Sequence, residues 1–357
     1  MGRVYTIDYL RGILALLVMV YHFSIWEKLF VPDAASALTR NALYGVSLFF
    51  IISGFSLTLS YYRKFDRFNT LSLKDYFYKR FARIYPLYWL VVALFLTALL
   101  VGGKTFPPIE QILLNLSLTF VLFGHYTGFT AGSWSIGMEI AFYLLLPFAL
   151  YALRKAKKTG LTALGALAFG ALGVSAFGMF DSPETAEYWP IYMNPLNHVY
   201  FFLFGIVAGV LYIEHNNLFS LPKRTVWFLI ATTALAAVFY PIEGGIVALI
   251  YEENRLILSA VALTLFYLFT ALNPHVEHQS PAAKTLERFG NISYTLYLLH
   301  PVVFLVCNVL WFRNSDIAPQ AQIVFMILAT LVASHFVYER YELPLTRSLL
   351  SRRARHD

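Results

Sequence analysis

At 357 residues, with 59% hydrophobic and only 13% charged residues, the chain carries too few charges to cover the surface of a water-soluble globule. Its 17% aromatic content and long apolar runs exclude a disordered chain, and its single cysteine excludes a disulfide framework. The net charge of +7 is typical of a membrane protein with basic cytoplasmic loops, so we expect no nucleic-acid partner.

A helix that crosses a bilayer needs about 20 mostly apolar residues, and such windows recur along the whole chain. We therefore predict an all-α polytopic membrane protein with about ten transmembrane helices, organised as one membrane domain over residues 1–357. The predicted spans are 7–25, 43–62, 84–102, 133–153, 161–180, 196–213, 225–241, 255–273, 293–312 and 321–338. The first has no small-residue cleavage site, which predicts a retained anchor.

The distribution of basic residues orients the predicted helices. With the N-terminus inside, 22 of the 27 Lys and Arg residues fall in inner segments, so both termini are predicted to be cytoplasmic and 339–357 to form a basic cytoplasmic tail. Segment 109–124 is also apolar, but an extra span there would move the basic cluster 154–158 outside. We expect this segment to be interfacial or re-entrant.

The first predicted span carries an arginine and a histidine on one face. Arg11 and His22 are eleven residues apart, close to three helical turns, so both side chains leave the same side of the helix about 16 Å apart. Ionisable groups at membrane depth are costly and often functional. The structural alternatives are a snorkelling Arg11 and a packed, hydrogen-bonded His22.

Glu139 is predicted to lie about one turn inside the outer end of its span, close to the depth of His22. A carboxylate beside a histidine orients the ring and stabilises its charged form, as a general base requires. The alternative is a glutamate that packs against an arginine or tyrosine of another helix.

Arg80 and Arg83 lie three residues apart at the cytoplasmic entry of the third span. This spacing places both guanidinium groups on one helical side, where they can clamp a phosphate or diphosphate. Anchoring by the positive-inside rule explains them equally well.

Other polar residues in the spans are weaker candidates. We interpret His300, which precedes Pro301, as structural or pocket-lining, and Ser53 as helix packing because no nucleophile-elbow motif surrounds it. His198 and His335 are weak candidates, and no metal is expected because no ligand spacing appears.

Five sequence blocks resemble the membrane acyltransferase 3 family, in the family's order over residues 7–301. They are IDYLRGILALLVMVYHFS with its R-x10-H signature, GVSLFFIISGFSL, KRFARIYPLYWL with R-x-x-R, GSWSIGMEIAFY and NISYTLYLLHP. Arg11 and His22 match the signature pair, and Arg80 and Arg83 match the R-x-x-R. Glu139 matches the family's glutamate.

The resemblance implies transfer of an acyl group, usually acetyl, from cytoplasmic acyl-CoA to a hydroxyl of a cell-envelope glycan, lipid-linked sugar or small molecule. Arg80, Arg83 and Arg11 would then hold the coenzyme, with His22, oriented by Glu139, as base or acyl carrier. Ser47 departs from the family, because many relatives have an acidic residue there, and the glutamate block carries one Glu where some have two. We expect a stand-alone form, without an appended esterase-like domain, in the cell (inner) membrane.

Two other functions remain open from the sequence. A multi-pass transporter of a sugar or small organic molecule also carries membrane-embedded charges, although carriers more often show repeat symmetry and interrupted helices. A non-catalytic partner of a polysaccharide synthase would tolerate loss of Arg11 and His22. Acceptor identity, the length of the acyl group and the oligomeric state are left open.

Overall fold

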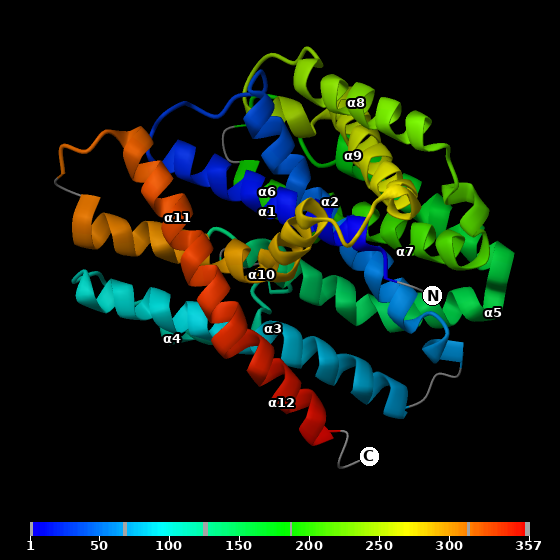
Figure 1. The fold of residues 1–357 in the computed structure, drawn as a ribbon, viewed down its shortest axis with the longest axis horizontal. Coiled ribbons are helices and arrows are strands. Elements are labelled where there is room, and N and C mark those ends of the chain that lie inside the picture. The colour runs from blue at the N-terminus through cyan, green and yellow to red at the C-terminus, as the bar shows by residue number, and fades with distance from the viewer. Residues whose placement is uncertain (1–2, 67–69, 124–127, 186–187, 313–314, 354–357) are drawn as a thin grey trace. The chain divides into compact units, whose positions relative to one another are not determined.

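The computed structural model describes residues 3–66, 70–123, 128–185, 188–312 and 315–353, and every regular element within these ranges is a helix (Figure 1). The all-α prediction is therefore confirmed. The α-helices are α1 (Tyr5–Trp26), α2 (Ala37–Tyr61), α3 (Thr70–Val101), α4 (Ile109–Ser117), α5 (Ser133–Phe177), α6 (Tyr188–Tyr192), α7 (Val199–Glu214), α8 (Lys223–Phe239), α9 (Glu252–Leu272), α10 (Pro281–Cys307), α11 (Pro319–Val337) and α12 (Leu343–Arg353). Asn308–Phe312 and Tyr338–Glu342 are π-helical turns that continue α10 and α11.

Each of the ten predicted spans overlaps a helix. Within the described ranges, seven helical segments are long and apolar enough to cross a membrane. Two predicted spans share α5, while those at 196–213 and 225–241 are the shorter helices α7 and α8, of 16 and 17 residues. The chain is thus a multi-pass membrane protein, and the count of ten and the cytoplasmic position of the termini stay predictions.

A break divides α5 into two helical parts. At 45 residues, α5 would be about 68 Å long if straight, twice the thickness of a bilayer core. Lys157 interrupts it with φ 48° and ψ −120°, a conformation that L-residues rarely adopt. The break falls in the basic cluster that the sequence places between two spans.

The described part of segment 109–124 contains one short helix. Helix α4 has nine residues, about 14 Å, and ends where Leu118 adopts a left-handed conformation with φ 58°. Its Asn115 side-chain oxygen accepts hydrogen bonds from the Tyr88 hydroxyl of α3 at 3.3 Å and the backbone N–H of Phe129 at 2.9 Å. At about 14 Å, α4 is too short to cross a bilayer core of about 30 Å, and the interfacial or re-entrant position of this segment stays a prediction. Gly124 lies outside the described residues.

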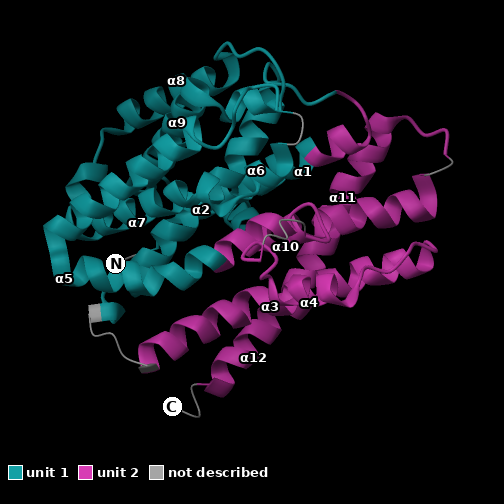
Figure 2. Cartoon of the chain, turned by 180° about the vertical axis from the view of Figure 1, so that it is seen from behind, with its two compact units in different colours: residues 1–21, 31–67, 141–291 teal, residues 22–30, 68–140, 292–357 magenta. Residues whose placement is uncertain are grey.

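The chain folds into two compact units (Figure 2). Unit 1 comprises residues 1–21, 31–67 and 141–291, and unit 2 comprises residues 22–30, 68–140 and 292–357. In unit 2, α12 and the π-turn before it pack along α3. The hydroxyl of Thr346 on α12 donates to the carbonyl of Ala82, and that of Tyr341 on the π-turn donates to the carbonyl of Pro86. Residues 339–353, predicted as part of a basic tail, are therefore helical and packed, while 354–357 lie outside the described residues.

In unit 1, two glycines bring α2 and α7 into backbone contact. A Cβ on Gly205 would lie 2.2 Å from the carbonyl oxygen of Ile51, and a Cβ on Gly54 would lie 2.3 Å from the carbonyl oxygen of Phe202. Small residues permit such close crossings in membrane helices. Glycine is therefore required at both positions, because no space is left for a side chain between the two helix backbones.

We expect Gly205→Ala to destabilise the protein by about 1–3 kcal/mol, because the added methyl group collides with backbone that cannot move aside. The measurement is the apparent Tm of the purified protein in detergent. Gly173→Ala in α5 is the matched control, since a Cβ there meets nothing within 4 Å. An unchanged Tm for Gly205→Ala would show that α2 and α7 do not cross this closely.

Candidate active site

His22 lies in unit 2, one turn before the end of α1, and its ring is held by its neighbours. Its Nδ1 lies 2.9 Å from Nε2 of His300 on α10, and the two ring planes differ by only 10°. Trp26, one turn further along α1, lies parallel to His22 with ring centroids 4.9 Å apart. His300 is fully buried, whereas His22 is partly exposed. The imidazole of His22 is thus fixed in orientation, in a residue that is partly exposed.

Aromatic side chains surround this pair. Phe304 on α10 packs against Trp26 with a centroid distance of 4.8 Å and against Phe23 at 6.3 Å. Phe23 also meets His300 edge-on, at 6.0 Å. These rings exclude water from the buried side of the histidine pair, so the hydrogen bond between the imidazoles lies in a low-dielectric environment.

Glu139 reaches the same region through Tyr297. The Glu139 carboxylate, near the start of α5, interacts electrostatically with the phenol of Tyr297. One turn earlier on α5, the Ser135 hydroxyl lies 2.8 Å from the Tyr297 hydroxyl, and the Tyr297 ring lies 5.9 Å from that of His300. The sequence predicted that Glu139 orients His22, and the structure places Nε2 of His300 at hydrogen-bonding distance from Nδ1 of His22.

Arg80 and Arg83 lie three residues apart on α3, as predicted, in unit 2. Arg83 forms an ion pair with Glu342, whose other carboxylate oxygen accepts the Thr295 hydroxyl. The guanidinium also lies over the Tyr294 ring, 5.5 Å from its centroid. Glu342 is 2% exposed, whereas 32% of the Arg83 side chain remains exposed. The ion pair therefore fixes Arg83 while part of its side chain faces outward.

Glu342 and Thr295 were not anticipated. The final predicted span ended at residue 338, where the hydropathy falls, and Glu342 was assigned to the tail. The Tyr338–Glu342 π-turn instead continues the helix and buries this carboxylate. The only sequence signal is the pair of acidic residues in YERYE at a helix end. This pattern does not by itself identify a π-turn, although such turns are frequent at functional sites.

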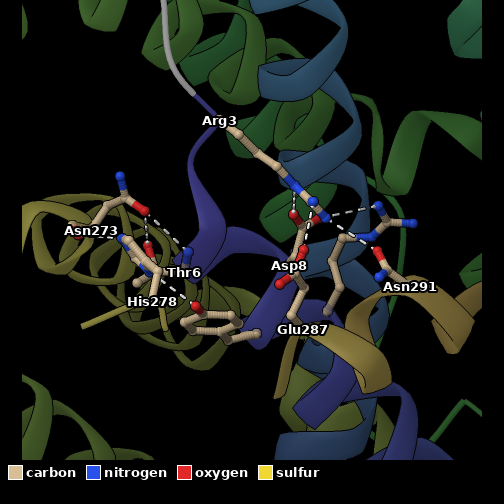
Figure 3. Close-up of polar contacts among 9 residues, drawn as sticks. Arg3, Thr6, Asp8, Asn273, His278, Glu287 and Asn291 are labelled. Carbon is tan, nitrogen blue, oxygen red and sulfur yellow. Dashed lines mark hydrogen bonds and ion pairs between the residues drawn. The ribbon is translucent and has the colours of Figure 1, made fainter. Parts of the chain in front are cut away.

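Arg11 lies in unit 1, next to a charged cluster at the start of α1 in which Figure 3 shows Arg3 close to Asp8, Glu287 and Asn291. Its guanidinium is 3.8 Å from Asp8, and Arg3 donates to Asp8 at 2.8 Å, to Glu287 at 2.6 Å and to Asn291 at 3.1 Å. Burial lowers the pKa of Arg3, but the two carboxylates outweigh this and raise it above its ordinary value. Because α1 is uninterrupted, Arg11 and His22 share one helix with a rise of about 16 Å, as predicted.

The weaker candidates have local roles or surface positions. In unit 1, the Ser53 hydroxyl lies 2.9 Å from the Tyr143 hydroxyl, and Nε2 of buried His198 lies 2.8 Å from the carbonyl of Tyr192. Ser47 is buried on α2, and His335 is exposed on α11. Among the described residues, no group of three or more His, Cys, Asp and Glu residues is arranged to hold a metal ion.

Comparison with known proteins supplies the family. A model described as an acyltransferase domain matches residues 4–339. Nodulation protein 10 of Rhizobium leguminosarum bv. viciae is 31% identical over 186 residues, which cover 46% of this chain and 48% of that protein. Acyltransferase MdmB of Streptomyces mycarofaciens is 29% identical over 223 residues, 57% of this chain and 56% of its own.

The chain spans about half the length of these curated relatives. No solved structure matches it at a significant level. The family model nevertheless covers nearly the whole sequence, including the helices that carry Arg11, His22, Arg80, Arg83, Glu139 and His300. This multi-pass helical chain therefore belongs to the membrane acyltransferase 3 family.

Proposed function

We propose that this protein is an integral-membrane O-acyltransferase that moves an acyl group, most simply acetyl, from cytoplasmic acyl-CoA to a hydroxyl of a cell-envelope glycan or related sugar-containing acceptor. The observation that carries the proposal is the fixed imidazole of His22, a partly exposed residue, in a chain that the acyltransferase family model matches over residues 4–339. We further propose ten spans with both termini cytoplasmic, in the cell (inner) membrane.

His22 would act as the general base. It takes the proton of the acceptor hydroxyl as the oxygen attacks the thioester carbonyl, and a C–O bond forms while the C–S bond breaks. The departing coenzyme thiolate then takes the proton from the His22 imidazolium, which restores the neutral ring. The aromatic rings of Phe23, Trp26 and Phe304 favour this proton transfer, because they exclude water and polar interactions are stronger in a dry site.

The arginines of α3 would hold the coenzyme phosphates. Glu342 engages one terminal nitrogen of Arg83 and Tyr294 supports the guanidinium plane, so its remaining donors are presented without further ordering. Arg80, one turn earlier and partly exposed, supplies the second cation. Arg11 is a third candidate contact, and Glu139 tunes the site through Tyr297.

The main alternative, a sugar or small-molecule carrier, predicts no consumption of thioester. Washed membranes that contain the protein are incubated with acetyl-labelled acetyl-CoA, with and without the host's envelope glycans. Release of coenzyme A thiol that depends on the glycan, with label in the glycan, supports the transferase. The transferase would be overturned if no label enters the glycan and the amount of acetyl-CoA thioester stays unchanged.

His22→Gln should lower the rate of transfer by about 10²- to 10⁴-fold, because general-base assistance is worth that much. The readout is acceptor-dependent thiol release, normalised to the amount of protein in the membrane. His335→Gln is the matched control, since His335 is an exposed histidine on α11. Near-normal transfer by the His22 variant would remove His22 from the mechanism.

Arg83→Met should destabilise the protein by about 3–5 kcal/mol, because it leaves the buried carboxylate of Glu342 without its counter-ion. The double variant Arg83→Met, Glu342→Leu should recover most of that stability, since neither charge remains. The apparent Tm in detergent measures this effect.

The same double variant separates folding from donor binding. It lacks one proposed phosphate contact, so we expect its KM for acetyl-CoA to rise roughly tenfold, which corresponds to the loss of one charge-assisted contact. Recovery of both Tm and wild-type KM would restrict Arg83 to a structural role.

A further inference from the structure

We propose that His300 is a positioning residue that sets the tautomer of His22 and so directs its basic nitrogen, Nε2, toward the acceptor hydroxyl. This inference rests on the proposed acyltransferase function. It assigns to a neutral imidazole the orienting role that was predicted for the carboxylate of Glu139.

The backbone of α10 fixes the first proton. Nδ1 of His300 lies 3.3 Å from the carbonyl oxygen of Leu296, one turn earlier on the same helix. A carbonyl oxygen only accepts hydrogen bonds, so Nδ1 of His300 carries the hydrogen and donates it. In a neutral ring, Nε2 of His300 then has a lone pair and can only accept.

The second proton follows from the first. Nε2 of His300 lies 2.9 Å from Nδ1 of His22, so Nδ1 of His22 must be the donor. A neutral His22 with hydrogen on Nδ1 has its lone pair on Nε2. The two hydrogen bonds that run from the Leu296 carbonyl through both imidazoles therefore leave Nε2 of His22 as the basic nitrogen. His22 is the partly exposed residue of the pair.

The burial of His300 makes this arrangement selective. Its side chain is fully buried between Phe23, Trp26 and Tyr297, with centroid distances of 5.8 to 6.0 Å. The opposite proton arrangement would set the Nδ1 lone pair of His300 against the lone pairs of the Leu296 carbonyl. An unsatisfied polar atom costs most in such a dry environment.

The same hydrogen bond serves both protonation states of His22. When Nε2 of His22 takes up the acceptor proton, Nδ1 continues to donate to His300, and the bond becomes charge-assisted and stronger. His300 thus stabilises the cationic ring without carrying a charge itself. A buried carboxylate in its place would have to be desolvated before any proton moved.

The first test compares two variants of His300 in acceptor-dependent thiol release. His300→Phe keeps a flat ring but removes the acceptor, so we expect kcat to fall about 10²-fold or more with the KM for acetyl-CoA unchanged, because a wrong tautomer costs a triad enzyme about 10⁴. His300→Gln offers an amide oxygen to Nδ1–H and should retain markedly more activity than His300→Phe. His335→Phe is the matched control on α11.

The second test reads the tautomer directly and does not depend on a variant of His300 folding. The full chain is labelled with ¹⁵N-histidine, reconstituted in lipid bilayers and studied by NMR, and the His22 signals are those lost in His22→Gln. We expect hydrogen on Nδ1 and a bare Nε2 in the wild type. Hydrogen on Nε2 with a bare Nδ1, or a doubly protonated resting ring, would overturn the proposal.

The outcomes separate this inference from the proposed function. If wild-type membranes transfer no acyl group, the function fails whatever the tautomer of His22. If the wild type is active and His22→Gln is inactive, but His300→Phe matches the wild type in kcat, the function stands and the role of His300 fails. Equal losses in His300→Phe and His300→Gln, with an unchanged His22 tautomer, would likewise reject the role.

Discussion

The structure depends on one constraint: a polar side chain in an apolar helix must find its partner inside the protein, because the bilayer core offers no water. His22 meets the constraint with the ring of His300, and Arg83 meets it with the carboxylate of Glu342. Arg40, 4% exposed, meets it with the backbone carbonyls of Ala35, Val238 and Tyr240. Each solution ties together segments distant in sequence, so the polar residues specify how the helices pack.

Hydropathy predicted most of the fold because an apolar run of sufficient length has few structures open to it. Each of the ten predicted segments overlaps a helix, and the basic cluster that was expected to separate two of them contains the break at Lys157. The ends were less predictable. The last predicted span stopped at the charges of YERYE, whereas the helix continues because Glu342 is neutralised by a residue on another helix. A hydropathy window averages along the chain and is insensitive to such a partner.

Within the site, too, relations along one helix could be predicted from the sequence and contacts between helices could not. The relations within one helix, Arg11 with His22 and Arg80 with Arg83, follow from the helical repeat. The partners across helices do not, since sequence spacing contains no information on which faces of α1 and α10 meet. Predicted depth and the family resemblance made Glu139 a candidate partner of His22, whereas the contact between His22 and His300 depends on how the helices pack.

Unit 2 holds two different polar pairs: a charged pair, Arg83 with Glu342, and an uncharged hydrogen-bonded pair, His22 with His300. The guanidinium of Arg83 is balanced by a carboxylate while part of its side chain stays exposed, which would suit the polyanionic donor of the proposed function. Around His22 the directing group is an uncharged imidazole between aromatic rings. A carboxylate at that position would stabilise the imidazolium more strongly but would also attract water and raise the cost of burial. A neutral partner keeps the site dry, and under the proposed function a dry site would let a hydroxyl and a thioester react without competition from water as acceptor.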